Sequence, residues 1–534
     1  MSNNSPQKRE VRFFNTTGPC NPWDHYMLPP EDRLVGAQLH RYIRDSLYWV
    51  LHAPRQTGKT TFLQSWMREI NAGDEAVACY VTLERCQGVP EQERAMPAIC
   101  DAVTDAAQKN NLPIPAMETK NPQSQLNDIL SNWAVLVAPN PLIVLFDEVD
   151  VLTGEALISF LRQLRGGFAN RGIGSFPVSI ALVGMRDLKD YITQAKDPGF
   201  FHVKKSYAPN PGSPFNIKED SAVLSNFHKD DIVKLFAQRT EETGQHITGE
   251  ALEYVYDQSR GQPWIVNSLF KRAVMRVLDE DSRETVTIEH VCRAREQMIL
   301  ARETHLDSLA VRMEDPKIRR VMETLISGEA DPALTEGEGF RICLDLGLVT
   351  IEKGTPIVAN PIYREVLARH ITYGTQLAIP APEWQWEKAD GSLDMDALLR
   401  EFQRFWRKHS EVWEQKSDYT EAFPHLLLMA FLQRVLNGGG RIEREYAAGR
   451  GRMDLGVEYN KRWYIIEIKL VHSYDTPEEI KEDGLRQTAM YRDKTDGAAP
   501  AYLLIFDRRP AAKQKSWDER LTWTNEGAIT VVGC

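Results

Sequence analysis

Nine residues early in the chain carry its strongest structural signal: Ala53-Pro54-Arg55-Gln56-Thr57-Gly58-Lys59-Thr60-Thr61. The apolar run Tyr48 to His52 precedes them, and a helical pattern from Lys59 to Asn71 follows. In a strand, a glycine loop and a helix in this order, backbone N–H groups can surround a phosphate at the positive end of the helix. Lys59 supplies a cation for the β- and γ-phosphate oxygens and Thr60 a hydroxyl for Mg²⁺. The segment therefore predicts an ATP site formed by all nine residues.

A pair of carboxylates further along the chain completes this predicted site. The apolar run Leu142 to Phe146 ends in Asp147 and Glu148, which places both acids at the C-terminal end of a buried strand. We expect Asp147 to hold Mg²⁺ with Thr60 and Glu148 to polarise the attacking water during ATP hydrolysis.

These two motifs resemble the Walker A and Walker B motifs of AAA+ and STAND P-loop ATPases, with Ala53 in place of the usual first glycine. The resemblance covers about residues 12–375. It implies that Arg186, after the run Val178 to Val183, is either a γ-phosphate sensor or part of a structural ion pair. It also implies that Gly261-Gln262-Pro263 corresponds to the GxP motif of the STAND lid.

The same resemblance implies a homo-oligomer, because AAA+ enzymes usually complete the ATP site with an arginine from a neighbouring subunit. Arg165 or Arg171 could supply it, or either residue could belong to an ordinary solvated face.

A second group of chemically active residues lies towards the C-terminal end of the sequence. Asp454 stands on one β-like run, and Glu467 and Lys469 stand two apart in the apolar run Ile465 to Leu470, so they share one strand face. A hairpin turning near residues 459–461 would bring Asp454 beside Glu467. Two carboxylates would then bind Mg²⁺ or Mn²⁺, and Lys469 would orient or deprotonate a hydrolytic water.

This pattern resembles the PD-(D/E)XK nuclease superfamily. Glu421 on an upstream helix matches the first-helix acid of that superfamily, and Gln487 and Tyr491 match its QxxxY motif. The resemblance covers about residues 393–534 and adds Glu421 and Gln487 to the predicted catalytic residues.

The fold class expected from these patterns is a multidomain α/β protein with a P-loop parallel sheet and a restriction-endonuclease-like C-terminal domain. Strand-like runs alternate with helical patterns around the P-loop, as in a sheet buried on both faces. We divide the chain into a lead-in strap (1–33), an ATPase core (34–225), a helical lid (226–312), a winged-helix domain (313–373), a linker (374–394) and the nuclease-like domain (395–534).

Composition limits the cellular context and the partners. No run approaches the ~20 apolar residues of a membrane span, and the polar start MSNNSPQKRE has no apolar signal core, so we expect a cytoplasmic protein without membrane contact. Seven cysteines without a CxxC pair give no zinc site. Because the net charge is −11, DNA contact requires a local basic patch. Six basic residues near the second site could neutralise DNA phosphates or could form an ordinary solvated basic edge: Arg441, Arg444, Arg450, Arg452, Lys461 and Arg462.

The two groups of residues together favour an ATP-controlled, metal-dependent DNA endonuclease. The resemblance adds a role in prokaryotic defence against foreign DNA, with a protein or a foreign component as the trigger. Two alternatives stay open: a signalling or scaffold ATPase whose nuclease-like domain binds without cutting, and an ATP-driven motor that acts on DNA.

Overall fold

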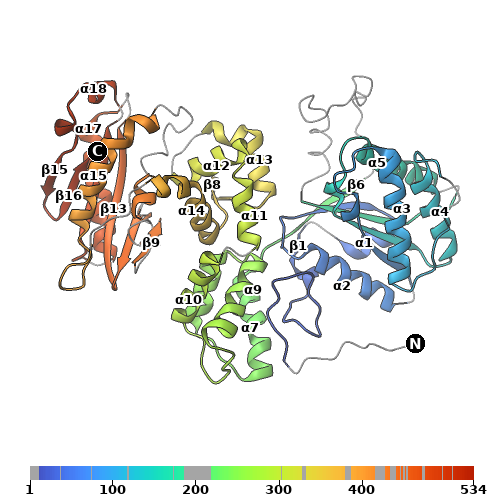
Figure 1. Cartoon of the computed structure of the whole chain (residues 1–534). Helices are drawn as coiled ribbons and strands as arrows, with labels where there is room; N and C mark the ends of the chain where they lie inside the picture. Colours follow the sequence, from blue (N-terminus) through green and yellow to red (C-terminus); the bar gives the residue numbers. More distant parts are fainter. Residues whose placement is uncertain are drawn as a thin grey trace. The chain divides into compact units, whose positions relative to one another are not determined.

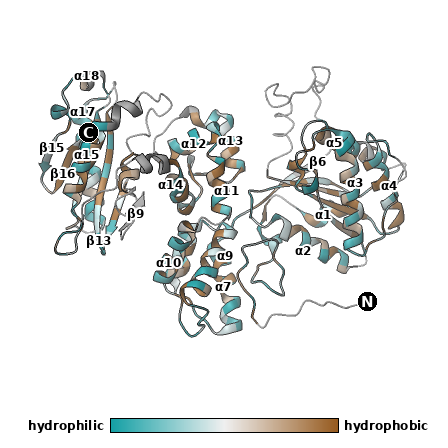
Figure 2. Cartoon of the chain, in the orientation of Figure 1, coloured by the Kyte–Doolittle hydropathy of each residue, from teal (hydrophilic) through white to brown (hydrophobic). Residues whose placement is uncertain are grey.

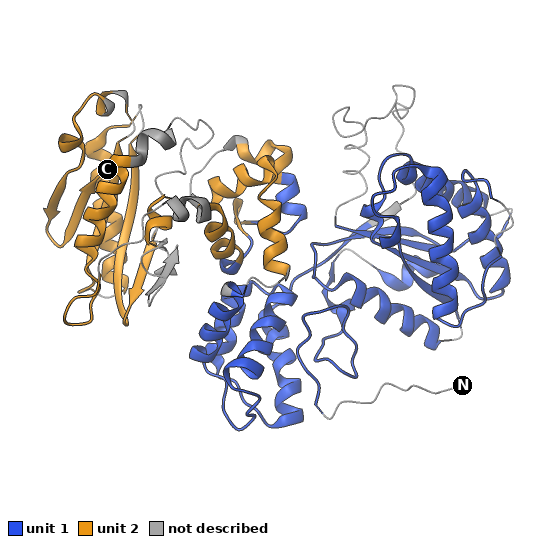
Figure 3. Ribbon diagram, in the orientation of Figure 1, with its two compact units in different colours: residues 1–303, 341–350, 359–362 blue, residues 304–340, 351–358, 363–534 orange. Residues whose placement is uncertain are grey.

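The structure of the 534-residue chain is a computed structural model (Figure 1). It describes residues 11–35, 38–73, 75–116, 120–171, 174–185, 218–301, 304–327, 332–378, 386–414, 427–432, 440–444, 447–448, 451–452, 455–471, 475–495, 497–507 and 509–534. The chain divides into two compact units, coloured in Figure 3. Unit 1 contains residues 1–303, 341–350 and 359–362, and unit 2 contains residues 304–340, 351–358 and 363–534.

Unit 1 is built on a six-stranded sheet with the order β1-β6-β2-β5-β4-β3. Its strands are β1 (Leu34–Val35), β2 (Tyr48–His52), β3 (Val77–Thr82), β4 (Leu142–Asp147), β5 (Ser179–Gly184) and β6 (Lys218–Leu224). All neighbours are parallel except β1 and β6. The predicted parallel sheet is therefore confirmed, and β5 lies between the strand that enters the glycine loop and the strand that ends in Asp147.

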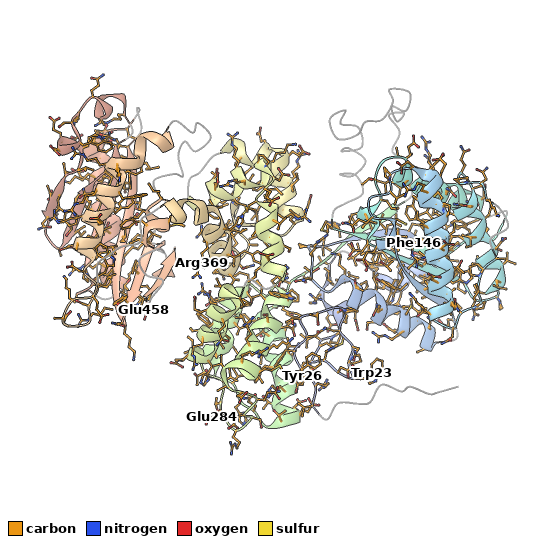
Figure 4. All side chains as sticks on the ribbon, in the orientation of Figure 1. Trp23, Tyr26, Phe146, Glu284, Arg369 and Glu458 are labelled. Carbon is orange, nitrogen blue, oxygen red and sulfur yellow. The ribbon has the colours of Figure 1, made fainter. Side chains whose placement is uncertain are left out.

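Helices bury both faces of this sheet. On one face lie α1 (Leu39–Arg44) and α2 (Lys59–Ala72), and on the other lie α3 (Gln92–Lys109), α4 (Gln125–Leu136) and α5 (Gly154–Asn170). The strands between them are mostly hydrophobic, as Figure 2 shows, and Phe146 on β4 is fully buried (Figure 4). Continuous apolar strands are what a sheet covered on both faces requires.

Helices α7 (Lys229–Thr243), α8 (Gly249–Ser259), α9 (Pro263–Arg272) and α10 (Ile288–Leu300) form the predicted helical region after the sheet. The N-terminal strap packs on these helices. Phe14 stacks on Phe236 of α7 with ring centroids 5.8 Å apart and contacts Phe270 of α9 at 5.0 Å. Tyr26, labelled in Figure 4, lies 4.9 Å from the Phe14 ring. The irregular segment rich in proline and aromatics is thus an ordered part of unit 1.

Between residues 304 and 378 the chain forms α11 (Thr304–Arg312), α12 (Pro316–Ser327), α13 (Glu338–Asp345), β7 (Val349–Glu352), β8 (Thr355–Val358) and α14 (Pro361–Ala378). Strands β7 and β8 pair as predicted, and Lys353 and Gly354 turn between them with φ of +51° and +82°. The winged-helix assignment and the domain boundaries remain predictions.

The C-terminal part of unit 2 contains a second six-stranded sheet with the order β15-β16-β14-β13-β12-β9. Its strands are β9 (Gly440–Arg444), β12 (Leu455–Tyr459), β13 (Arg462–Val471), β14 (Ala501–Asp507), β15 (Trp523–Glu526) and β16 (Ile529–Gly533). Helix α17 (Pro477–Thr495) connects the parallel strands β13 and β14. Helix α15 (Met395–Glu414) packs on β14, where Trp406 meets Phe506 at 5.0 Å between ring centroids.

No helix in the described ranges has both the length and the apolar composition of a membrane span.

A glycine holds the start of α9 against the chain that leads into α7. Gly261 has φ of +76°, and a Cβ there would lie 1.9 Å from the carbonyl oxygen of Phe227. Gly244 shares this φ of +76° but has open space around it, so a substitution there tests the cost of the left-handed backbone without a steric clash.

We predict that Gly244→Ala lowers the stability of the full chain by about 1 kcal/mol and Gly261→Ala by about 3 kcal/mol. Differential scanning calorimetry checks the order, and equal shifts in Tm would contradict the close approach.

Candidate nucleotide and metal sites

The glycine loop joins β2 to α2 as predicted. Gly58 caps α2 with φ of +97°, and its missing side chain leaves room for Arg33, whose Nη2 would lie 2.9 Å from a Cβ. Lys59 donates from Nζ to the carbonyl oxygens of Ala53 at 2.7 Å and Pro54 at 3.0 Å. Burial lowers the pKa of Lys59, and the nearby carboxylate of Asp147 opposes that effect. The cation therefore lies inside the loop, where the sequence predicts phosphate.

Arg33 from the strap fixes the outer side of this loop. Its Nη2 donates to the carbonyl oxygen of Thr57 and its Nη1 to that of Ser225, both at 2.9 Å. Arg33 is 6% exposed, and desolvation lowers its pKa to about 10, so it stays charged at neutral pH. A planar guanidinium can serve two acceptors at once, and Arg33 thereby joins the loop to the segment that follows β6.

Asp147 is the centre of the predicted magnesium site. Its Oδ2 accepts hydrogen bonds from Thr60 Oγ1 at 2.7 Å and from the Tyr80 hydroxyl at 3.1 Å, and its Oδ1 accepts from the backbone N–H of Glu148 at 2.9 Å. The side chain is almost fully buried. The predicted partners Thr60 and Asp147 are therefore brought together, and Tyr80 is a member that the motif did not reveal.

Glu148 follows in a strained backbone conformation, with φ of +58° and ψ of +39°. Left-handed geometry at a residue other than glycine often marks a functional site. Burial raises the pKa of Glu148, and the charges of Asp150 and Asp147 raise it further. Burial also raises the pKa of Asp150, which neither motif had indicated. The structure thus places a cluster of three acids at the end of β4.

The strand β5 ends beside the loop, because the carbonyl oxygen of Gly184 accepts from the backbone N–H of Ala53 at 3.3 Å. This is the position predicted for a sensor, but Arg186 itself lies outside the described residues. Arg171 donates to the carbonyl oxygens of Ser46 and Val178, at 2.6 and 2.9 Å, so it has a structural role. Arg165 is exposed on α5 and remains a candidate for the intersubunit arginine.

The strap and the lid motif also reach the loop. The backbone N–H of Cys20 donates to Thr61 Oγ1 at 3.0 Å, and Gln262 Nε2 donates to the carbonyl oxygen of Gln56 at 3.4 Å. The predicted GxP motif therefore contacts the predicted ATP site, with Gln262 also capping α9 through its bond from Ile265 N–H at 2.7 Å.

The second site is organised by the hairpin of β12 and β13, which turns at Asn460 and Lys461 with φ of +49° and +64°. Two left-handed residues are typical of a tight hairpin turn. In the resulting register Leu455 pairs with Ile466. The hairpin predicted from the sequence is therefore confirmed, and the strand pair is antiparallel.

Glu467 and Lys469 lie on the same face of β13, with Lys469 Nζ 3.3 Å from Glu467 Oε1. The Glu467 side chain is only 3% exposed and that of Lys469 is 20% exposed. Helix α17 supplies Gln487, whose Oε1 accepts from Lys469 Nζ at 2.8 Å. The structure thus brings together three of the predicted catalytic residues from two distant segments.

Two predicted residues of this site, Asp454 and Glu421, lie outside the described residues. Within the described ranges, no group of three or more His, Cys, Asp or Glu side chains is arranged to hold a metal ion. The carboxylate oxygens of Glu467, like the oxygens of Thr60 and Asp147 in unit 1, are hard donors of the kind that Mg²⁺ prefers.

Residues 419–502 match the sequence model of the PD-(D/E)XK nuclease superfamily. The chain contains a PD-(D/E)XK nuclease domain. The matched segment includes Glu467, Lys469 and Gln487, so the family assignment and the geometry agree.

Several solved structures are similar to the chain. The Walker-type ATPase PABY2304 of Pyrococcus abyssi matches over 66% of this chain and 99% of its own, at 14% identity and a TM-score of 0.47. The ORC2 protein of Aeropyrum pernix matches over 63% and 91%, at 15% identity and 0.37. The RuvB motor of Thermotoga maritima matches over 61% and 90%, at 16% identity and 0.32. No curated protein sequence matches the chain.

In the PD-(D/E)XK domain, Asp483 is a member of the site that sequence reasoning missed. Its Oδ2 accepts from Gln487 Nε2 at 2.7 Å and lies 3.6 Å from Lys469 Nζ. Asp483 and Gln487 stand four apart on α17 and share one helix face. This spacing was the available signal, because it extends the QxxxY pattern by one turn towards the N-terminus.

Gly484 explains how α17 approaches the PD-(D/E)XK site so closely. A Cβ at this position would lie 2.7 Å from Leu503 Cδ1 and 3.1 Å from Lys469 Cγ. Because the helix has no side chain there, its backbone packs directly on β13 and β14. The two polar residues beside the glycine in α17 can then reach the Lys469 ammonium.

The fork of Arg33 generates a prediction for nucleotide binding in unit 1. Arg33→Lys keeps a cation but cannot serve Thr57 and Ser225 from a planar fork. We expect the affinity for ATP to fall by about tenfold, which corresponds to about 1.4 kcal/mol. Titration calorimetry with Mg-ATP checks this. Arg44→Lys, at an exposed helix end, is the matched control, and equal affinity in both variants would refute the role of Arg33.

Proposed function

We propose that this protein is an ATP-controlled, metal-dependent DNA endonuclease. The observation that carries the proposal is the contact set of Lys469, whose ammonium lies within 3.6 Å of Glu467, Asp483 and Gln487 in a PD-(D/E)XK domain. An ammonium held by three partners from a strand and a helix is preorganised, which is what positions a catalytic group.

The residues have distinct roles in this proposal. Glu467, with Asp454 and Glu421, would hold Mg²⁺ or Mn²⁺, which when bound polarises the scissile phosphate and lowers the pKa of a bound water. Lys469 orients the attacking water or takes its proton. Gln487 fixes the direction of the Lys469 side chain by accepting a hydrogen bond from Nζ. Asp483 accepts a hydrogen bond from Gln487 and lies 3.6 Å from Nζ as an ion-pair partner.

DNA is the proposed substrate because basic residues surround this site in the sequence. Lys461 at the tip of the hairpin is exposed. Arg462 beside it is bound to Asp390 Oδ2 at 3.0 Å, which reduces its availability for phosphate. Of the other four arginines, Arg450 lies outside the described residues, as do the side chains of Arg441, Arg444 and Arg452. Lys461 is therefore the best described candidate for a backbone phosphate contact.

ATP control is proposed because Lys59 lies inside the glycine loop of unit 1 and Thr60 is hydrogen-bonded to Asp147. The loop region also contacts the N-terminal strap and the GxP motif. Binding of Mg-ATP would change these contacts and so change the state of unit 1. We propose that this state, through assembly into a homo-oligomer, licenses cleavage, and that the biological setting is prokaryotic defence with a protein or a foreign component as the trigger.

One prediction of this proposed function tests DNA cleavage itself. We expect the full chain to cut DNA in the presence of Mg²⁺ or Mn²⁺ and ATP, and Asp454→Ala or Lys469→Ala to reduce the rate by at least about a hundredfold, because each removes a group of the catalytic step. Lys494→Ala, an exposed lysine at the end of α17, is the control. Gel assays on several DNA and RNA forms, with Lys59→Ala beside them, measure both cleavage and its ATP dependence. Cleavage that persists in Asp454→Ala and Lys469→Ala would overturn the proposal.

Another prediction of the proposed function concerns Asp483 as a positioning residue. Asp483→Asn keeps the size of the side chain but removes the charge that faces Lys469, and we expect the single-turnover cleavage rate to fall by about tenfold. The affinity for DNA in Ca²⁺ should stay unchanged, because Asp483 acts through Lys469 and not on the substrate. Glu482→Gln, on the exposed neighbour, should have the wild-type rate. A parallel loss of DNA binding would assign Asp483 to folding or to the substrate surface.

A further inference from the structure

A cavity of about 400 Å³ lies in unit 1, outside the glycine loop. It is bounded by α2, β3 and α3, and its lining includes Met67, Arg68, Tyr80, Arg85, Asp105 and Lys109. The volume is that of a small-molecule site. None of these residues belongs to the motifs that predict the two sites already described.

The cavity exists because β3 is the edge strand of the sheet, and the helices on the two faces do not close over the edge. The free edge is already occupied by side chains of α2. The amide of Asn71 pairs with both the N–H and the carbonyl of Ala78, at 2.7 and 2.8 Å, and the N–H of Tyr80 donates to Met67 Sδ at 3.3 Å. An added strand is therefore excluded there, and the cavity presents side chains to its occupant.

The charges around the cavity are mainly positive. Arg68, Arg85 and Lys109 face one carboxylate, Asp105, which forms an ion pair with Arg85. The hydrogen bond and the charge of Arg85 lower the pKa of Asp105, and the charge of Lys109 lowers it further. The Nε of Arg68 donates to the Gln64 carbonyl at 2.9 Å, and its guanidinium lies 5.5 Å from the centre of the Trp23 ring. Arg68 is thus held in place at a cavity that Lys109 also lines, and two cations at one cavity suit a phosphate group.

The rest of the lining is apolar and includes an aromatic ring. Met67, Ala102 and Ala106 form the wall beside Tyr80. A flat ring could lie against these side chains while a phosphate group bound to it reaches Arg68 and Lys109. An organic phosphate with an aromatic or heterocyclic ring matches this combination better than inorganic phosphate, which would leave the apolar wall uncovered.

Tyr80 connects the cavity to the predicted magnesium site. Tyr80 is one of the lining residues, and its hydroxyl donates to Asp147 Oδ2, the same oxygen that accepts from Thr60. A ligand that packs on the ring would hold Tyr80 against Asp147 and fix the orientation of that carboxylate.

We propose that this cavity is a regulatory site for a ring-bearing organic phosphate, and that its occupant tightens the binding of Mg-ATP through Tyr80 and Asp147. The claim that an organic phosphate binds depends only on the lining of the cavity. The regulatory part also rests on the proposed ATP binding at the glycine loop, so the two are measured separately.

The binding test uses phenyl phosphate as the probe and the full chain carrying Lys59→Ala, which removes the phosphate cation of the glycine loop. We expect calorimetry to show binding in the millimolar range or tighter, and Arg68→Gln or Lys109→Gln to raise the Kd at least about tenfold. Arg94→Gln, an exposed arginine on the same helix as Lys109 but outside the cavity, should leave the Kd unchanged. Absence of binding up to about 20 mM, or equal Kd values in all variants, would overturn the site.

The coupling test uses the chain with an intact glycine loop. Saturating phenyl phosphate should lower the Kd for Mg-ATP at least about threefold, and Mg-ATP should tighten phenyl phosphate by the same factor. Tyr80→Phe keeps the ring but removes the hydroxyl, so phenyl phosphate should still bind while the effect on Mg-ATP disappears. An unchanged effect in Tyr80→Phe would refute the coupling route. If Mg-ATP does not bind the wild-type chain at all, the proposed ATP site fails and the binding test still decides the cavity.

Discussion

The hydrogen bond between Thr60 and Asp147 is the interaction on which the organisation of unit 1 depends. It joins the first turn of α2 to the end of β4 at 2.7 Å, although 87 positions separate the two residues in the chain. The bond is possible because parallel strands place their carboxyl ends on one edge of the sheet, where loops and helix starts meet. The strand β5 lies between β2 and β4, and its terminal Gly184 carbonyl holds the backbone of Ala53.

The buried charged groups of unit 1 are stabilised by hydrogen bonds within the protein instead of by contact with solvent. Asp147 is nearly inaccessible to solvent, yet it accepts three hydrogen bonds, from Thr60, Tyr80 and the N–H of Glu148. Arg33 is compensated by two carbonyl oxygens. An uncompensated ion at such depth costs several kcal/mol, so each of these groups is held in one orientation. That fixed orientation is what a magnesium or phosphate site requires.

The same physical rule governs the PD-(D/E)XK domain in unit 2. The charged pair of Glu467 and Lys469 lies within an apolar strand. Helix α17 supplies polar partners that offset the free-energy cost of burying these charges. Gly484 allows this helix to approach, because any larger residue would meet Leu503. A glycine without a left-handed φ thus controls the distance between two elements and, through it, the geometry of a catalytic group.

The sequence by itself determined the glycine loop, the apolar strand that ends in Asp147, the hairpin that carries Glu467 and Lys469, and the helix that carries Gln487. These features depend on local spacing, hydrophobic alternation and turn chemistry, which a linear pattern contains. The strand order, the edge position of β3, the strands β1 and β6, and the partnership of Tyr80, Arg33 and Asp483 were decided only by the tertiary structure. Each of these depends on a contact between segments far apart in the chain, and no local pattern records which distant side chain will fill a given space or satisfy a given buried charge.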